Sequence, residues 1–362
     1  MKKSFTPYDL PLKDIDWTSF VRFIGPAHDA VARFDGLLQS IPNPAVLLSP
    51  LTTREAVLSS KIEGTQATMQ EVLKYEADPK LTKRTDDIKE VLNYRRAMSY
   101  AMQDLNRIGF TLRLLTSMHR ILLSGVRGER GDAGDFRKMD VYIGSPGSLK
   151  NARFIPPKWQ DLNKHLENLE QYINYRDKDI LVQLAIIHAQ FEIIHPFRDG
   201  NGRMGRIILP LFLTFKGVLS TPMLYLSEYF ESNRQEYYER LQFISDKNQW
   251  NEWIIYFLQA VINQSKKNIQ KAKDIQSLYE IKKQKIKNLT NSKYSVDALD
   301  CIFKIPILNS VQFKEFSRIP NASADRILKN LTKGEVLRIL QKGSGTRPTL
   351  YVFDKLLSIV EK

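Results

Sequence analysis

The chain contains 362 residues, of which 43% are hydrophobic and 10% are aromatic, and its formal net charge is +14. The length indicates about two domains, and the hydrophobic content excludes a disordered protein. The single cysteine, Cys301, excludes a disulfide framework and a cysteine-based zinc cluster, and it indicates a reducing compartment. The first residues show no signal peptide, and no stretch reaches the roughly 18 apolar residues of a membrane span. We therefore expect a cytoplasmic protein that does not contact a membrane.

The basic residues are concentrated near the C-terminus. Residues 265–362 contain 20 Lys and Arg against 9 Asp and Glu, whereas residues 1–264 contain 34 against 31. This asymmetry predicts a chain in two parts, in which the basic part could meet nucleic acid or another anionic partner. The lysines of residues 282–287 fit a solvated helix face equally well.

An unusual carboxylate ends a predicted helix in the N-terminal region. Ser49 and Pro50 suit the N-cap and the first turn, the helix continues over residues 52–62, and Gly64 closes it. Glu63 directly precedes this glycine, although the last turn of a helix favours cations and a misplaced carboxylate costs about 0.3–1 kcal/mol. A local rule broken without a visible gain suggests a function, but exposed carboxylates also occur at such positions without one.

The segments that follow predict a helical body. Apolar residues recur every three or four positions in residues 86–105, 111–123 and 158–175. Residues 181–194 are apolar almost all round, which is typical of a helix at the centre of a bundle. A second apolar helix is expected over residues 202–217, where a glycine ends it.

Residues 125–157 form a connection far longer than usual within this body. They hold six of the chain's 17 glycines and two strand-like pieces, residues 140–144 and 152–155. Long loops in compact domains are usually functional. We predict a β-hairpin flap.

The turn between the two apolar helices, residues 195–206 with the sequence HPFRDGNGRMGR, predicts an anion site. Gly200 and Gly202 allow a tight turn and a close approach of a ligand. The free N–H groups and the positive dipole end of the next helix point into this turn. Arg203 and Arg206, one helical turn apart, add donors suited to phosphate oxygens. Each residue alone has a structural explanation, but their combination favours phosphate or nucleotide binding.

Two further side chains of this turn suggest chemistry. Asp199 suits a hard cation, such as a Mg²⁺ ion that bridges phosphates. His195 belongs to the residue type that titrates near neutral pH, so it could accept a proton from an incoming hydroxyl group.

The last part of the chain predicts a winged helix-turn-helix. Helices are expected over residues 296–304, 310–317 and 321–331, with Asn321 as an N-cap. Two β-rich runs, residues 335–340 and 349–353, then flank a basic, glycine-rich segment. A long polar helix over about residues 251–288 connects this part to the body.

The motif of residues 195–206 also carries a family resemblance. It matches H-x-F-x-D-G-N-G-R-x-x-R at every position, the signature of the Fic family of protein adenylyltransferases, and the chain resembles this family from about residue 30 to residue 265. The resemblance implies a mainly α fold, a Fic-fold helical bundle with a β-hairpin flap. It also implies an enzyme that moves AMP from ATP to a Ser, Thr or Tyr hydroxyl of a target protein, and of itself, releasing pyrophosphate.

The resemblance assigns roles residue by residue. His195 is the base, Asp199 holds Mg²⁺ between the α- and β-phosphates, and the flap of residues 141–155 docks the target by adding a strand. Arg203 and Arg206 bind the β- and γ-phosphates. The residues that bind ATP are Gly200, Asn201, Gly202, Arg203, Met204, Gly205 and Arg206, with Asn233, Tyr237 and Tyr238 against the adenine.

Ser59, Glu63 and Gly64 match the family's inhibitory pattern, [S/T]-x-x-x-E-[G/N]. It lies N-terminal to the catalytic motif, as in the branch whose inhibitor belongs to the same chain. The resemblance implies that Glu63 pairs with Arg206 and occupies the place of the γ-phosphate, so that the enzyme rests in a self-inhibited state. In some relatives the same glutamate supports removal of AMP, and the sequence leaves this open.

Other functions also stay open at this point. The protein could remove AMP from a modified protein or transfer another nucleotide-derived group. It could also be a DNA-binding regulator that senses ATP, although a pure sensor has no need of His195. We expect an N-terminal helical region with the inhibitory helix over residues 1–110, a catalytic core over 111–265, a helical connector over 266–290, and a winged helix over 291–362. The winged helix would bind DNA or a protein. The target and the oligomeric state, including a homo-oligomer, are not fixed by the sequence.

Overall fold

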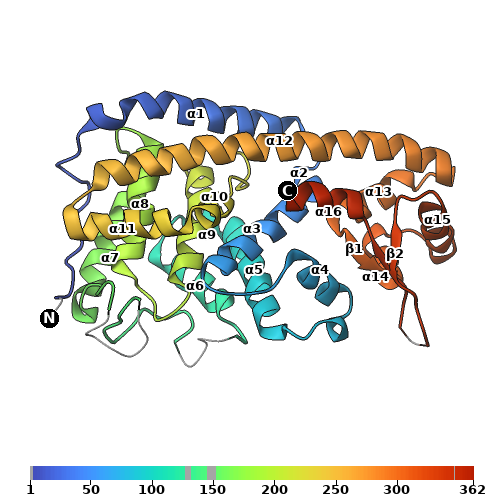
Figure 1. Ribbon diagram of the computed structural model, residues 1–362, viewed down its shortest axis with the longest axis horizontal. Helices are drawn as coiled ribbons and strands as arrows, with labels where there is room; N and C mark the ends of the chain where they lie inside the picture. Colours follow the sequence, from blue (N-terminus) through green and yellow to red (C-terminus); the bar gives the residue numbers. More distant parts are fainter. Residues whose placement is uncertain (1–2, 127–131, 145–151, 346) are drawn as a thin grey trace.

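The structure, a computed structural model, describes residues 3–126, 132–144, 152–345 and 347–362. It is mainly α-helical, as predicted, and a small sheet lies in its C-terminal part (Figure 1). Before the flap the helices are α1 (Trp17–Ser40), α2 (Pro44–Leu47), α3 (Ser49–Ile62), α4 (Met69–Ala77), η1 (Pro79–Leu81), α5 (Thr85–Ile108) and α6 (Leu112–Leu122). After the flap come η3 (Trp159–Asp161), α7 (Leu162–Asn174), α8 (Ile180–Ile194), α9 (Asn201–Phe215), α10 (Ser227–Ser232), α11 (Arg234–Lys247) and α12 (Trp250–Thr290). Within the described ranges, no helix has both the length and the apolar character needed to cross a membrane.

Helix α12, with 41 residues, packs along α1 and runs through most of the length of the molecule (Figure 1). Its first half turns large apolar side chains inward, because Trp253, Phe257 and Val261 follow one another at four-residue spacing and have no exposed surface. Its second half reaches the C-terminal unit, which we define as residues 291–362. The helix crosses the boundary predicted at residue 266 without a break.

Helices α8 and α9 lie in the core, as their apolar sequences predicted. Asp179 caps α8 by accepting hydrogen bonds from two backbone N–H groups of the first turn. Helix α9 begins at Asn201, directly after Gly200, whose φ of 77° is left-handed. Nearly every residue of both helices is buried. The turn that joins them, residues 195–200, is therefore held between two packed helices.

Helix α3 begins differently from the prediction. Ser49 is its first residue rather than its N-cap, and Leu48 precedes it without a side-chain cap. The reason is that α2 runs almost directly into α3, so the Leu48 carbonyl accepts the Leu51 N–H. The helix ends at Ile62, and Gly64 follows Glu63 with a left-handed φ of 99°.

The two strand-like pieces of the flap meet at one point. Ile143 and Phe154 form an isolated antiparallel bridge, in which the Ile143 N–H donates to the Phe154 carbonyl at 2.9 Å. The pairing is shorter than predicted, because the Ile155 carbonyl accepts instead from the Phe5 N–H and the two prolines that follow have no N–H to continue a ladder. The predicted turn of the flap, residues 145–151, lies outside the described residues.

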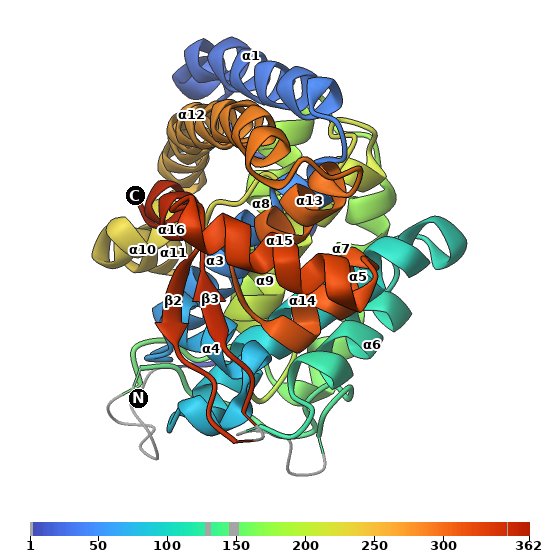
Figure 2. The same cartoon turned by 90° about the vertical axis from the view of Figure 1, so that its right-hand side faces the viewer.

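The C-terminal unit combines helices with a three-stranded antiparallel sheet in the order β1-β3-β2 (Figure 2). Its elements are α13 (Ser295–Lys304), β1 (Ile307–Asn309), α14 (Ser310–Ser317), α15 (Asn321–Lys333), β2 (Arg338–Gln341), β3 (Leu350–Val352) and α16 (Asp354–Glu361). Asn321 is the first residue of α15 rather than its N-cap, because Pro320 occupies the capping position. The assignment as a winged helix stays a prediction.

This unit packs against the part of the body that carries Glu63. Helices α13 and α16 contact α3, and β1 contacts α4. The side-chain amide of Asn309 donates to the Ala77 carbonyl at 2.6 Å, and that of Gln312 donates to the Glu76 carbonyl at 2.8 Å. On its other sides α3 contacts α5, α9 and α10. The helix before Glu63 is therefore enclosed by both parts of the chain.

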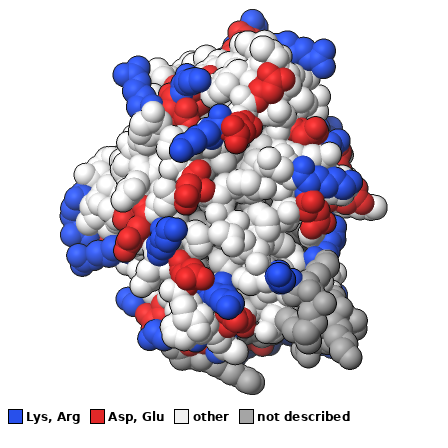
Figure 3. All heavy atoms as spheres, turned by 90° about the vertical axis from the view of Figure 1, so that its left-hand side faces the viewer, with Lys and Arg blue, Asp and Glu red and all other residues white. Residues whose placement is uncertain are grey.

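The two parts also differ in charge. At the end of the molecule away from the C-terminal unit, basic and acidic side chains lie among one another (Figure 3). This mixture agrees with the near-neutral composition of the first 264 residues.

Candidate active site

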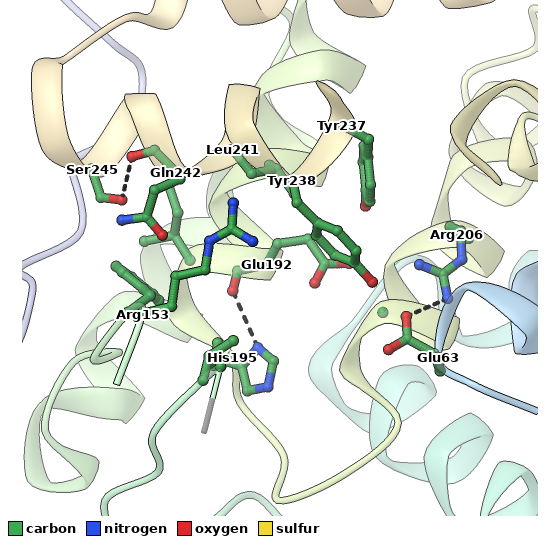
Figure 4. Close-up of a pocket in the computed structure, with 15 residues that line it drawn as sticks. Glu63, Arg153, Glu192, His195, Arg206, Tyr237, Tyr238, Leu241, Gln242 and Ser245 are labelled. Carbon is green, nitrogen blue, oxygen red and sulfur yellow. Dashed lines mark hydrogen bonds and ion pairs between the residues drawn. The ribbon is translucent and has the colours of Figure 1, made fainter. Parts of the chain in front are cut away.

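A pocket of about 290 Å³ opens between the flap and helices α8, α9 and α11 (Figure 4). Glu63, which follows α3, lines it together with Ile143 and Phe154 of the flap, His195, and Arg206 of α9. Two motifs that are far apart in the sequence therefore share one pocket.

His195 follows α8 with a left-handed backbone, at a φ of 50°. Its Nδ1 atom lies 3.3 Å from the carbonyl oxygen of Glu192. Since a carbonyl can only accept, Nδ1 carries the proton of the neutral ring and Nε2 keeps its lone pair. Burial lowers the pKa of His195 to about 4, and the charge of Arg137 also lowers it. The ring is neutral at pH 7 and can accept a proton at Nε2.

Asn201 fixes the shape of the turn. Its side-chain oxygen accepts from the Phe197 N–H at 2.9 Å, and its amide donates to the Phe197 carbonyl at 2.8 Å. These two bonds close the turn across the start of α9. The side chain of Asn201 therefore shapes the backbone of the turn. An anion in the pocket would bind instead to the backbone N–H groups at the start of α9.

Arg206 is buried and holds the end of α3. Its Nε donates to Ser59 Oγ at 2.8 Å, and its Nη2 donates to the Ser59 carbonyl at 2.8 Å and to Glu63 Oε1 at 2.6 Å. Burial by itself raises the pKa of Glu63, but the charge and hydrogen bond of Arg206 outweigh it, and the pKa is lowered. Glu63 is ionised at neutral pH, and the pair is an ion pair.

Gly202 makes room for this carboxylate. A Cβ atom at Gly202 would lie 2.1 Å from Glu63 Oε1, which is far inside a normal contact. Glu63 thus rests on the bare backbone of the first turn of α9. The place it occupies is the end of a helix dipole that attracts anions.

Arg203 points to a different partner from Arg206. Its guanidinium is 3% exposed and lies 3.3 Å from Glu90 of α5 and 3.6 Å from Asp199. Glu90 also accepts a hydrogen bond from the Thr65 hydroxyl at 2.8 Å. Arg203 therefore links the turn to α5 and to the segment after α3.

Asp199 lies beside the pocket rather than among the residues that line it. Its side chain is 51% exposed, and Oδ1 accepts from the Gly200 N–H at 2.5 Å. Among the described residues, no group of three or more His, Cys, Asp or Glu side chains could hold a metal ion by itself.

His119 is a residue near the site that the sequence did not reveal. Its Nδ1 accepts from the Gly134 N–H at 3.0 Å, so its Nε2 carries the proton and donates to the Asp199 carbonyl at 3.0 Å. Its ring stacks on Phe197 with 3.7 Å between the centroids. Burial lowers the pKa of His119 to about 4. This neutral ring therefore holds the turn in place through one hydrogen bond and one ring stack.

Arg137 is a second such residue, and it lies in the long connection before the flap. Its guanidinium donates to the backbone carbonyls of His195 (2.9 Å), Ile194 (3.3 Å), Pro157 (2.6 Å) and Met139 (3.1 Å). It thereby ties the end of α8 to both sides of the flap. A buried arginine surrounded by carbonyls has no local sequence signal, because its partners come from three separate segments.

The remaining predicted ATP residues divide into two groups. Tyr237 and Tyr238 line the pocket, and their hydroxyls bond His188 Nε2 at 2.9 Å and the Ile62 carbonyl at 3.3 Å respectively. Asn233 does not line it, since its amide donates to the Tyr229 carbonyl. Met204 and Gly205 are buried within α9. Beyond the tyrosines, the α11 side of the pocket is lined by Leu241, Gln242 and Ser245, which the sequence did not single out.

Two sequence profiles match this chain. The profile of the Fic/DOC family N-terminal region matches residues 21–103, and the profile of the Fic/DOC family matches residues 109–213. Together they cover just over half of the chain, and they include both Glu63 and the motif of residues 195–206. The chain belongs to the Fic/DOC family.

Curated relatives share part of the chain. It is 26% identical over 196 residues to a probable protein adenylyltransferase of Aquifex aeolicus, which covers 52% of this chain and 56% of that protein. It is 31% identical over 139 residues to the protein adenylyltransferase Fic of Drosophila melanogaster, which covers 37% of this chain and 26% of that protein. The chain thus spans about half the length of the first relative and about a quarter of the second.

Solved structures share the fold. A Fic family protein from Desulfovibrio desulfuricans is similar over 96% of this chain and 98% of that chain, with a TM-score of 0.60 and 20% identity. A fragment of Fic-1 from C. elegans is similar over 70% of this chain and 72% of that chain, with a TM-score of 0.50 and 20% identity. At these identities the likeness shows the fold alone.

Proposed function

We propose that this chain is a protein adenylyltransferase that moves AMP from ATP to a Ser, Thr or Tyr hydroxyl of a target protein. The observation that carries the proposal is the neutral His195 in a pocket that also holds Arg206 and the start of α9. The hydroxyl oxygen attacks the α-phosphorus, its proton passes to Nε2 of His195, and the bond to the oxygen bridging to the β-phosphorus breaks, releasing pyrophosphate. The names of the Aquifex and Drosophila relatives support this reaction.

The phosphates would bind where the charges favour them. The N–H groups of the first turn of α9 and its dipole attract an anion, and Gly202 allows a phosphate to approach the backbone as closely as Glu63 does. Arg206 would hold the γ-phosphate once Glu63 has left. Since its pKa is raised and it is buried beside the pocket, it keeps its charge and its orientation through the reaction.

Asp199 would hold Mg²⁺. A half-exposed carboxylate that belongs to no group of three or more acidic, histidine or cysteine side chains among the described residues suits an ion held mostly by phosphate oxygens and water. When bound, Mg²⁺ would neutralise charge on the phosphates. The turn that His119 and Asn201 brace would keep Asp199 in place.

The resting enzyme would be self-inhibited. The Glu63 carboxylate is bound by the arginine proposed for the γ-phosphate, at 2.6 Å, and it lies against the bare backbone of Gly202. A triphosphate that enters beside it would hold its α-phosphorus out of line with the hydroxyl, and small misplacements of reacting atoms can cost about 100-fold in rate.

The target protein would dock at the flap. The bridge between Ile143 and Phe154 leaves the flap short of a full ladder in its described part, so an extended target segment could add backbone hydrogen bonds there. Tyr142 is exposed beside this bridge and offers an apolar contact.

The C-terminal unit would recruit a partner, which is a duplex DNA or the target itself. Asn321, Arg326 and Lys329 are exposed along α15, with Ser323 partly exposed between them, and Lys342 and Arg347 are exposed near the β2–β3 connection. Binding of the full chain to duplex DNA should weaken steeply with salt. Failure to bind duplex DNA even at low salt would favour docking of a protein at this unit. Light scattering of the same sample separately tests whether the chain forms a homo-oligomer.

The decisive experiment uses ATP labelled at the α-phosphate. With Mg²⁺, the Glu63→Gly variant should label itself and a protein in cell lysate, and His195→Ala in the same background should not, although it still binds ATP. Labelling that occurs only with γ-labelled ATP would overturn the proposal of AMP transfer. Stronger labelling from another nucleotide would show that this nucleotide, and not ATP, is the donor. Loss of label from modified protein on adding the unsubstituted enzyme would indicate AMP removal instead.

A further inference from the structure

Glu192 lines the same pocket, and the reaction above does not use its side chain. It belongs to the last turn of α8, three residues before His195. Its Oε1 atom is buried and accepts or donates no hydrogen bond within the described part of the chain. A buried polar atom without a partner destabilises the fold, and an ionised one does so more than a neutral one. This burial therefore favours the neutral form of the carboxyl group, and the same side chain lines the pocket.

The packing around Glu192 holds this atom against α9. A Cβ atom on Gly205 would lie 2.3 Å from Glu192 Oε1, so the carboxyl group rests on the bare backbone of α9 just before Arg206. In the view of Figure 4 the carboxyl group lies between the His195 ring and the Glu63–Arg206 pair. The phosphates of the proposed substrate would pass through this part of the pocket.

The surroundings keep this carboxyl group neutral. Burial is the main cause that raises the pKa of Glu192 to about 8, Glu63 raises it further, and Arg206 lowers it. His188 and His195, whose pKa values burial lowers to about 3 and 4, and Tyr237 and Tyr238, whose pKa values burial raises, are neutral at pH 7. The guanidinium of Arg153, which lines the same pocket, is the further cation on this side. A protonated carboxyl group has an O–H to donate, whereas an ionised one can only accept.

We propose that Glu192 binds the nucleoside triphosphate as a neutral carboxylic acid, donating its O–H to a phosphate oxygen. This inference rests on the proposed function. Phosphate oxygens accept hydrogen bonds and repel carboxylates, so only the protonated form fits. The negative phosphates that replace Glu63 beside Arg206 favour the protonated form in the same way that Glu63 does. No covalent bond changes, and a protein whose Glu192 is ionised takes up one proton when the nucleotide binds.

Binding of a non-hydrolysable ATP analogue between pH 6.5 and 9.5 tests this proposal. In the Glu63→Gly background, Kd should rise with pH once Glu192 ionises in the free protein, approaching about tenfold per pH unit. Glu192→Gln keeps an N–H donor but does not titrate, so its profile should lack this rise. Glu192→Ala should weaken binding about tenfold at pH 7 and also lack the rise. Glu167→Gln, at an exposed position of α7, is the matched control and should follow the parent.

Calorimetry in two buffers of different ionisation enthalpy gives a second readout. Above the pKa of Glu192 in the free protein, the parent should take up close to one proton more than Glu192→Gln does, and the titration of the nucleotide itself cancels in this difference. The proposal is overturned if Glu192→Gln reproduces the parent's profile and proton uptake, or if Glu192→Ala binds the analogue more tightly at pH 7. A Glu63→Gly parent that binds no ATP analogue at any pH contradicts the proposed function itself.

Discussion

Neutral histidines lie in and around the turn of residues 195–200, and they link the stability of the fold to pH. Burial lowers the pKa values of His119 and His195 to about 4 and that of His188 to about 3, whereas a histidine in an unfolded chain titrates near 6.5. Between these values the unfolded chain binds more protons than the folded one. Folding is therefore favoured above about pH 6.5 and becomes less stable as the pH falls toward 4.

The three histidines lower the free energy of unfolding in urea between pH 7 and pH 5, whereas Glu55 and Glu192, whose pKa values burial raises to about 7 and about 8, act in the opposite direction. The slope has an upper limit of about 1.4 kcal/mol per pH unit for each histidine. His119→Gln should show a shallower slope than the parent, because one of the three groups no longer titrates. A slope for His119→Gln that equals the slope of the parent would contradict the neutral, buried state of the His119 ring.

The pKa of the proposed base also fixes the acid side of the activity profile. With the pKa of His195 lowered to about 4, AMP transfer by Glu63→Gly should show no inflection near pH 6.5 on the way from pH 7.5 to 5.5. Initial rates of labelling at saturating ATP measure this, with His195→Ala as the baseline. An inflection near 6.5 would mean that the ring is solvated in the working enzyme.

At the scale of elements, the end of α3 and the start of α9 act on each other through one ion pair. Glu63→Gly removes the carboxylate beside Gly202 and frees Arg206, so AMP transfer should rise strongly, by up to about 100-fold. Arg206→Ala breaks the same pair but also removes the anchor for the γ-phosphate, so AMP transfer should fall. Self-labelling with α-labelled ATP measures both.

Thermal unfolding is the control for this pair. If the Glu63–Arg206 pair were purely structural, both variants would have a lower melting temperature than the parent, and AMP transfer would fall with it. Lys61→Gln in the last turn of α3, whose partner is Glu231 rather than a pocket residue, should leave AMP transfer unchanged. If Glu63→Gly loses activity in step with its melting temperature, self-inhibition is excluded.

The sequence predicted those features whose residues are neighbours in the chain, and it did not reveal those that depend on contacts between distant segments. The motif of residues 195–206 and the helices around it were predictable, because their residues are neighbours in the chain. Glu63 could be singled out because it breaks the rule for a helix end. Arg137 and His119 could not, since they act through backbone groups of distant segments. The role of Asn233 at the adenine stays a prediction; in the structure its amide donates to the Tyr229 carbonyl, and it does not line the pocket.

The C-terminal unit was predictable in part for the same reason. Amphipathic helices such as α15 show a period that can be read from the sequence. Strand β1 has three residues, and its pairing with β3 joins segments more than 40 positions apart. Such a short strand has no period to detect. The contacts of this unit with α3 depend on the tertiary arrangement alone.

At the scale of the whole molecule, these contacts connect the C-terminal unit with α3, the helix that leads to Glu63 and that we propose to be inhibitory. A chain that ends after Phe353 lacks α16, which packs on α3 and α12. We expect self-labelling to rise in the otherwise unsubstituted chain and not to rise further in the Glu63→Gly background, because α3 loses one of its supports. Circular dichroism checks that the shortened chain is folded.

A matched control removes charge from the C-terminal unit without touching α3. Lys342→Gln with Arg347→Gln changes exposed residues near the β2–β3 connection and should leave self-labelling as it is. A folded chain without α16 whose labelling equals that of the full chain would show that the C-terminal unit does not support the inhibited arrangement.

If targets dock at the C-terminal unit, as proposed above, the length of the continuous helix α12 sets how far they must reach. At 1.5 Å per residue, its 41 residues form a rod of about 60 Å, with α8 and α11 packed near one end and the C-terminal unit at the other. A target held at the C-terminal unit must extend along much of this rod to bring a hydroxyl to His195. Small fragments of such a target, each able to reach only one end, would bind without being modified, and target size would become part of substrate selection.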